Sequence, residues 1–172
     1  DTTGQLDIDS VIAKGDIAKY KVIILADIPS LSEYAVQELE KYLEKGGAIF
    51  IAPGKNAEST DFAKFAKILP GEIGEIVETG NNYVSPVITA EDGIGLFSFA
   101  KSGAPISLNE IKIRKYYKLI PGKSAKVRAK FADSPCIISA NNGKGTSLLS
   151  SFPFDSSWSN LPFSADFFAS DS

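Results

Sequence analysis

Two short apolar runs separated by one helix-length segment do most to constrain how this chain folds. Residues 22–26 (VIILA) and 48–52 (AIFIA) are continuous and apolar, as expected of strands that are covered on both faces in a parallel sheet. Apolar residues between these runs recur at helical spacing, which predicts an amphipathic helix: Leu31, Ala35, Leu39 and Leu43. Residues 21–54 are therefore expected to form a right-handed strand–helix–strand unit.

Local signals mark both ends of the predicted helix. Ser30 and Glu33 have the spacing of a capping box, in which the serine hydroxyl accepts a hydrogen bond from the Glu33 amide and the glutamate reaches back. Gly46 and Gly47 follow the last apolar position, where glycine easily takes the positive φ that ends a helix. The helix is thus predicted to start at Ser30 and to stop before Gly46.

The rest of the chain changes from a helical to a strand-like pattern. A short strand is expected within residues 6–12, and Ser59 and Thr60 can cap a helix that follows them. From residue 107 onward apolar and polar residues alternate, which predicts several strands. Residues 141–145 (NNGKG) predict a hairpin turn between two of these strands.

The length predicts a single domain over residues 1–172. Its predicted class is α/β, with a mostly parallel sheet, flanking helices and additional antiparallel strands in the C-terminal half. Residues 71–106 are punctuated by glycine and proline with little periodicity, so they are expected to form an irregular insertion with short strands.

Composition excludes several classes of chemistry. The chain has no histidine and one cysteine, which rules out Ser-His-Asp and Cys-His catalysis and histidine metal sites. Eighteen basic and 21 acidic residues are mixed along the chain, which argues against nucleic acid as a partner. The longest apolar runs span about five residues, whereas a membrane-spanning helix needs about 20, so no segment is predicted to insert into a membrane. Since the chain starts at Asp1 and lacks methionine, we expect a fragment or a processed product.

Two short motifs have both a functional and a structural interpretation. Residues 143–146 (GKGT) resemble the end of a phosphate-binding loop, but Gly145 stands where that motif needs serine or threonine, so a hairpin turn is favoured. A D-x-S-x-S pattern matches the cation site of von Willebrand A-type domains: Asp155, Ser157 and Ser159. Because that motif belongs near the start of such a domain, packing of the final loop is the favoured interpretation and no metal site is predicted.

Candidate ligand-binding residues follow the two predicted parallel strands. Open α/β sheets bind ligands at the carboxyl ends of their strands, which here places five residues at one edge: Asp27, Ser30, Gly54, Lys55 and Asn56. A local turn is the alternative role for Asp27, and a solvated loop is the alternative for the residues around Lys55. No cofactor and no catalytic residue is predicted. Cys136 lies in an apolar run, which predicts a buried, inert thiol.

The order of these elements resembles a class I glutamine amidotransferase-like domain, in the form found in bacterial membrane proteins of the BatA type. The similarity lies in residues 22–54, in residues 65–70 (FAKILP), and in a closing segment with the pattern D-x-x-W-S-x-L-P at residues 155–162. In working members a nucleophilic cysteine follows the second strand, whereas this chain has Pro53 to Asn56 at that turn, so no catalytic residue carries over.

This resemblance implies a flavodoxin-like sheet whose first strand and helix lie upstream of Asp1. It also implies a non-catalytic domain of a membrane-anchored bacterial protein, facing the periplasm or the cell exterior. Its role would be contact with other regions of its own protein or with an envelope protein, or sensing of a small ligand. Two alternatives remain: a hydrolase or transferase that uses Asp27 and Asp155, and a cation-dependent adhesion module.

Overall fold

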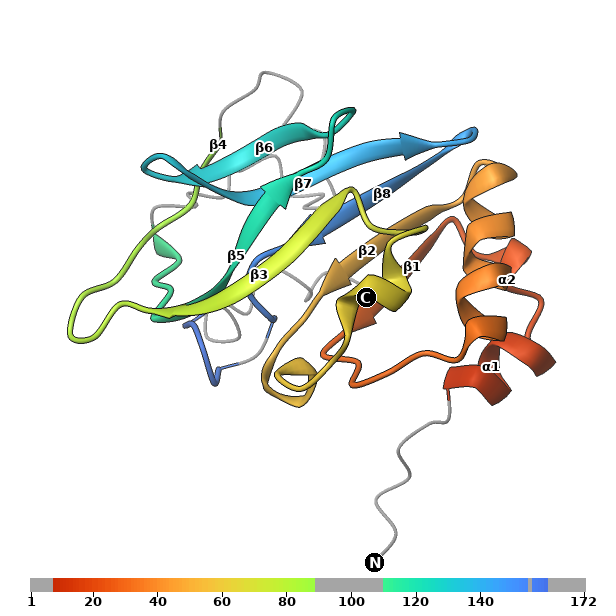
Figure 1. Ribbon diagram of the computed structural model, residues 1–172, viewed down its shortest axis with the longest axis horizontal. Coiled ribbons are helices and arrows are strands. Elements are labelled where there is room, and N and C mark those ends of the chain that lie inside the picture. Colours follow the sequence, from red (N-terminus) through yellow and green to blue (C-terminus); the bar gives the residue numbers. More distant parts are fainter. Residues whose placement is uncertain (1–7, 89–109, 155, 161–172) are drawn as a thin grey trace, which may run out of the picture.

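The computed structural model describes residues 8–88, 110–154 and 156–160, and it has a mixed six-stranded sheet at its centre (Figure 1). The sheet order is β1-β2-β8-β7-β6-β4. Its strands are β1 (Val22–Ala26), β2 (Ala48–Ala52), β4 (Val87–Ile88), β6 (Lys126–Phe131), β7 (Ser134–Asn142) and β8 (Gly145–Ser150). Two further strands, β3 (Gly71–Glu78) and β5 (Lys115–Pro121), form a separate antiparallel pair.

Helices are few among the described residues. Two α-helices, α1 (Ile8–Lys14) and α2 (Glu33–Glu44), lie together at one end of the molecule in Figure 1. Three short 3-10 helices lie wholly within the described residues: η1 (Ile17–Lys19), η2 (Lys55–Ala57) and η3 (Phe62–Phe65).

The predicted class, a mostly parallel flavodoxin-like sheet flanked by helices, is wrong. Within the described residues only the β1–β2 and β2–β8 pairs are parallel, and every other strand pair is antiparallel. The physical reason is connection length. Strands β6, β7 and β8 follow one another through tight turns, which can join only antiparallel neighbours. The antiparallel strands that were expected as an addition in the C-terminal half thus make up most of the sheet.

One face of the sheet carries the larger hydrophobic core. Helix α2 buries one side against the parallel strands, through Ala35, Val36, Leu39, Tyr42 and Leu43. The sheet contributes Leu25, Ile49 and Leu149, and Leu119 brings β5 to the same core. A second cluster is built around the antiparallel strands and includes Phe131, Cys136 and Phe152. The α2 side of the parallel strands is therefore filled by the protein itself.

The predicted strand–helix–strand unit is present, although its helix begins later than expected. Ser32, not Ser30, is the N-cap: its hydroxyl accepts a hydrogen bond from the Ala35 amide at 3.1 Å and donates one to Asp9 at 2.6 Å. The bond to Asp9 ties α2 to α1, a contact between distant parts of the chain that selects the second serine. Gly46 has φ of 103° and ends the helix as predicted.

Three other local predictions are wrong in part. The short strand expected within residues 6–12 is helix α1 where the structure describes it. The helix expected after Ser59 and Thr60 is the single 3-10 turn η3, capped by Asp61. The irregular insertion expected over residues 71–106 begins with the eight-residue strand β3, and its residues 89–106 lie outside the described part.

Candidate functional site

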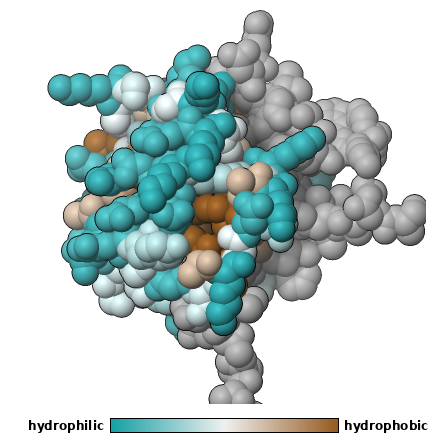
Figure 2. Space-filling model, turned by 90° about the vertical axis from the view of Figure 1, so that its right-hand side faces the viewer, coloured by the Kyte–Doolittle hydropathy of each residue, from teal (hydrophilic) through white to brown (hydrophobic). Residues whose placement is uncertain are grey.

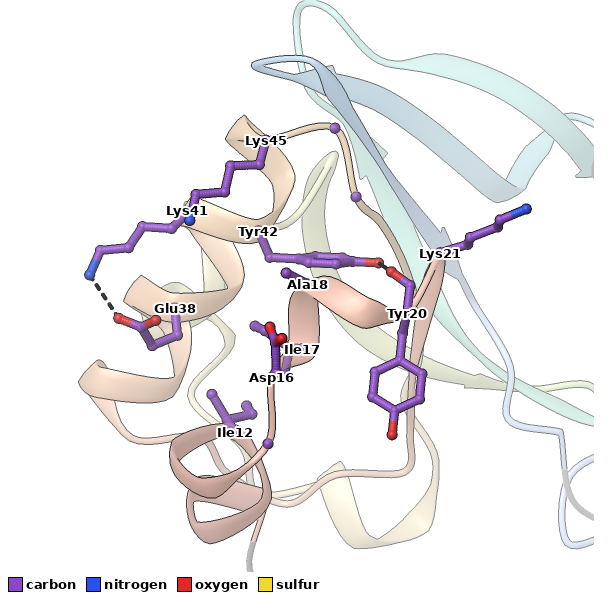
Figure 3. A pocket seen from close by; sticks show the side chains of 13 residues that line it. Ile12, Asp16, Ile17, Ala18, Tyr20, Lys21, Glu38, Lys41, Tyr42 and Lys45 are labelled. Atoms are coloured by element: carbon purple, nitrogen blue, oxygen red, sulfur yellow. Dashed lines mark hydrogen bonds and ion pairs between the residues drawn. The ribbon is translucent and has the colours of Figure 1, made fainter.

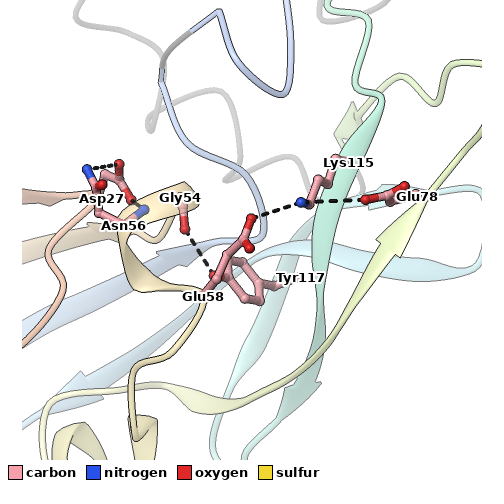
Figure 4. Close-up of polar contacts among 7 residues, drawn as sticks. All are labelled: Asp27, Gly54, Asn56, Glu58, Glu78, Lys115 and Tyr117. Atoms are coloured by element: carbon pink, nitrogen blue, oxygen red, sulfur yellow. Dashed lines mark hydrogen bonds and ion pairs between the residues drawn. The ribbon is translucent and has the colours of Figure 1, made fainter.

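Three of the predicted site residues meet where the parallel strands β1 and β2 end (Figure 4). The Asp27 carboxylate accepts two hydrogen bonds from Asn56, one from its backbone amide at 2.9 Å and one from its side-chain amide at 2.8 Å. Gly54 lies so close that a β-carbon there would be 2.8 Å from the Asp27 carboxylate and 2.9 Å from Pro153. The loops after the two strands are thus fastened together by these groups.

The backbone of Asp27 is itself constrained. Its φ of 49° lies in the left-handed region, which aspartate tolerates better than most residues. Its amide donates to the carbonyl of Ala52 at 2.8 Å, which extends the β1–β2 pairing by one bond. Asp27 therefore holds a turn between neighbouring strands, which was the structural alternative for this residue.

Tyr117 of β5 adds a buried hydrogen bond to this edge. Its hydroxyl donates to the carbonyl of Gly54 at 3.0 Å, and the residue is almost fully buried. Burial raises the pKa of Tyr117, and the nearby carboxylates of Glu58 and Asp27 raise it further. The hydroxyl is therefore held in its protonated, donating form and links β5 to the loop after β2.

Lys115, also on β5, joins two carboxylates and an aromatic ring. Its ammonium group lies 2.8 Å from Glu58, 3.5 Å from Glu78 and 4.9 Å from the ring centre of Trp158. The hydrogen bond to Glu58 is the main cause that raises the pKa of Lys115. The cation is thus neutralised within the domain.

The remaining candidate residues do not join this cluster. Ser30 and Lys55 are exposed, and neither takes part in the hydrogen bonds that the described residues form around Asp27. Tyr117, Glu58 and Lys115 were missed by the sequence analysis, because nothing in the sequence indicates that β5 packs against the loop after β2. Ligand binding by Asp27, Ser30, Gly54, Lys55 and Asn56 stays a prediction.

The alternative cation site is not assembled by the residues that the structure describes. Asp155 lies outside them, Ser157 is exposed, and Ser159 is buried in a β-bridge with Ile113. Within the described ranges, no three His, Cys, Asp or Glu residues come together as a metal site. Trp158 between these serines is 2% exposed and packs on Tyr117 at a ring-centre distance of 5.2 Å, as the packing interpretation predicted.

The motif that resembles a phosphate-binding loop is a hairpin turn. Gly143, with φ of 62°, lies in the turn between β7 and β8. A β-carbon at Gly145 would collide with the backbone carbonyls of Leu43 and Gly47, so the turn packs directly against the end of α2. Its glycines are explained by this close approach.

Cys136 is fully buried, and burial raises the pKa of its thiol well above the ordinary value. A thiol that stays protonated is a poor nucleophile. The prediction of a buried, inert thiol agrees with these surroundings.

A groove of about 410 Å³ lies between α1, η1 and α2, on the face shown in Figure 2. An apolar hollow on that face is surrounded by hydrophilic residues. Figure 3 shows the groove lining, in which Lys41 pairs with Glu38 at 2.7 Å and the Tyr42 hydroxyl donates to the Tyr20 carbonyl at 2.9 Å.

Comparison with known protein families shows to which family the chain belongs. The sequence matches the family model of the beta-galactosidase trimerisation domain over residues 3–160. The chain belongs to this family. The assignment to amidotransferase-like domains of BatA-type proteins is therefore wrong. It rested mainly on the order of strands and helices, which is too generic to distinguish one family from another.

Solved structures share the fold of this domain. A cytoplasmic protein from Salmonella typhimurium, STM3548, is 15% identical, with a TM-score of 0.63 over 91% of this chain and 71% of its own. The β-galactosidase of Rahnella sp. R3 is 17% identical, with a TM-score of 0.62 over 91% of this chain and 23% of its own. Gan42B, a GH42 β-galactosidase, is 14% identical, with a TM-score of 0.60 over 90% of this chain and 21% of its own. Comparison with the curated proteins finds no match.

These findings correct the predicted function and location. A membrane-anchored, periplasmic domain and a cation-dependent adhesion module both followed from resemblances that the family match replaces. Among the described residues, no helix is both long and apolar enough to cross a membrane. The prediction of protein partners is confirmed at the level of other subunits or domains, without the membrane protein or envelope partner that it named.

Proposed function

We propose that this domain is a non-catalytic module that joins three protein subunits into one assembly. The observation that carries the proposal is the family match, which spans almost the whole chain and names trimerisation. A domain of this kind acts through its surface, so it needs a rigid fold more than an open cleft with reactive groups.

The chemistry of the strand ends supports a structural role. The polar groups at this edge already have partners within the same domain. Asp27 is hydrogen-bonded to Asn56, and Tyr117 to the Gly54 carbonyl. Lys115 is paired with Glu58. The sequence contains no histidine, and its one cysteine is buried. General acid–base and nucleophilic catalysis need groups that are accessible to a substrate.

We further propose that the domain works beside a catalytic domain of a larger protein. It corresponds to about a fifth of each β-galactosidase to which it is similar, 21% of Gan42B and 23% of the Rahnella enzyme. The proposal assigns glycoside chemistry to the remaining part of such a protein and subunit contact to this domain.

Sedimentation equilibrium over a wide concentration range tests the role in assembly. The expected result is a species with three times the 18.4 kDa mass of one chain, in equilibrium with the monomer on dilution. A monomer at every concentration would contradict trimerisation. A separate assay with a nitrophenyl galactoside tests the non-catalytic role, because enzymatic hydrolysis by the purified chain would contradict it.

A further inference from the structure

An exposed apolar row lies at the start of the edge strand β1. Tyr20, Val22 and Ile24 occupy alternate positions and are 63%, 40% and 53% exposed. Large apolar side chains at such exposure are ordinary when they are scattered, but a contiguous group marks an interaction surface. We name these three residues the β1 row.

The direction of the β1 row follows from the strand itself. Ile23 and Leu25 point into the core that α2 covers, so Val22 and Ile24 point to the opposite face of the sheet. Among the described residues, strand β1 is also the last strand of the sheet on this side, and β2 is the one strand that pairs with it. A free edge and an exposed apolar face thus occur on the same strand, a combination that invites association with another chain.

The apolar surface continues across the parallel strands. Ile24 lies in register with Phe50 of β2, and Phe50 lies in register with Leu148 of β8. Both residues are partly exposed, and the Phe50 ring packs on Phe154 at 5.0 Å. The β1 row is therefore the outer part of a strip that crosses three strands.

The groove beside α2 borders this strip. Tyr20 belongs to the β1 row and also lines the groove, and Lys21 between two row residues lines it as well. Lys21 and Lys45 form no ion pair with any residue in the described ranges. Protein interfaces commonly have an apolar centre with a polar rim. The row supplies such a centre, and the lysines of the groove supply part of a rim.

We propose that the β1 row is the surface on which a second copy of this chain docks. This inference rests on the proposed function, since the trimerisation family makes copies of the same chain the partners. A closed ring of three copies needs a heterologous contact, in which one patch meets a different patch of the next copy. The β1 row is one side of that contact, and the next copy covers Val22 and Ile24 with a surface other than its own row.

Ile24→Lys tests this assignment, with Ile120→Lys as the matched control. Both residues are about half exposed, at 53% and 48%, but Ile120 lies on β5 in the other sheet. Ile24→Lys should sediment as a folded monomer with the circular dichroism spectrum of the parent chain, while Ile120→Lys stays trimeric. A trimeric parent together with a trimeric Ile24→Lys overturns the row and leaves the proposed function intact. A monomeric parent overturns both.

A cysteine scan gives a second measurement that does not depend on a disruptive charge. Cys136 is the only native cysteine and is fully buried, so Ile24→Cys carries the one accessible thiol. Its reaction with a maleimide should slow as the protein concentration rises through the range of association. The thiol of Ile120→Cys should react at a rate that does not change with concentration. A concentration-independent rate for Ile24→Cys in a chain that trimerises would overturn the assignment.

Discussion

Trp158→Ala removes the only tryptophan of the chain from a buried position. The ring contacts Tyr117 at 5.2 Å and Lys115 at 4.9 Å, and its backbone carbonyl accepts a hydrogen bond from the Arg114 amide. Truncation of a buried tryptophan to alanine costs about 3–5 kcal/mol of unfolding free energy. For a domain of this size each kcal/mol lowers the melting temperature by about 2–4 °C, which gives a fall of about 6–20 °C.

Urea unfolding followed by circular dichroism measures this loss without relying on the tryptophan signal that the substitution removes. Trp158→Phe is the control, since it keeps an aromatic ring on Tyr117 and should lose only about 1–2 kcal/mol. A Trp158→Ala change within about 0.5 kcal/mol, the range of ordinary surface substitutions, would refute the argument that this ring anchors the final segment.

Three further predictions concern other contacts. Gly54→Ala places a β-carbon 2.8 Å from the Asp27 carboxylate, so unfolding free energy in urea should fall by about 1–3 kcal/mol; an unchanged value would contradict the close approach. The hydrogen bond to Glu58, which raises the pKa of Lys115, stabilises the fold at pH values below the ordinary lysine pKa of 10.5. This stabilisation is lost as the pH rises through the pKa of Lys115 in the folded state. In Glu58→Gln the melting temperature should fall less at alkaline pH than it does in the parent chain. The same dependence of melting temperature on pH in both would contradict the pairing of Lys115 with Glu58. Cys136 should react with a thiol reagent only as the domain unfolds, whereas rapid reaction in native buffer would show an accessible thiol.

Local sequence patterns predicted the elements whose hydrophobic residues have a clear period. Apart from the start of α2, the predictions of helix α2 and of strands β1 and β2 are correct, because their apolar residues repeat along the helix or run without interruption. Helix α1 was mistaken for a strand because it is short: of its side chains at positions 9–14, Ile12 is the one that is buried in the core, which leaves no period to detect. The helix is held by the bond between Asp9 and Ser32, a contact that no local window contains.

The direction of the strands could not be predicted in the same way. Strand β8 enters the sheet between β2 and β7, and its parallel pairing with β2 joins residues about a hundred positions apart. In the candidate site too, local sequence predicts some contacts, while others depend on packing between distant parts of the chain. Asp27, Gly54 and Asn56 were expected together because they follow adjacent strands, whereas Tyr117 and Lys115 reach that edge through the packing of β5, which the sequence does not encode locally.

The position of β8 also determines when the fold can be completed during synthesis. The first strand, α2 and β2 emerge early, but β2 receives its second neighbour only after residues 145–150 have been made. Until then the inner edge of β2 has no partner in the native sheet, and it is open to strands of other nascent chains. Pairing of β2 with β8 therefore closes this edge only near the end of the described sequence.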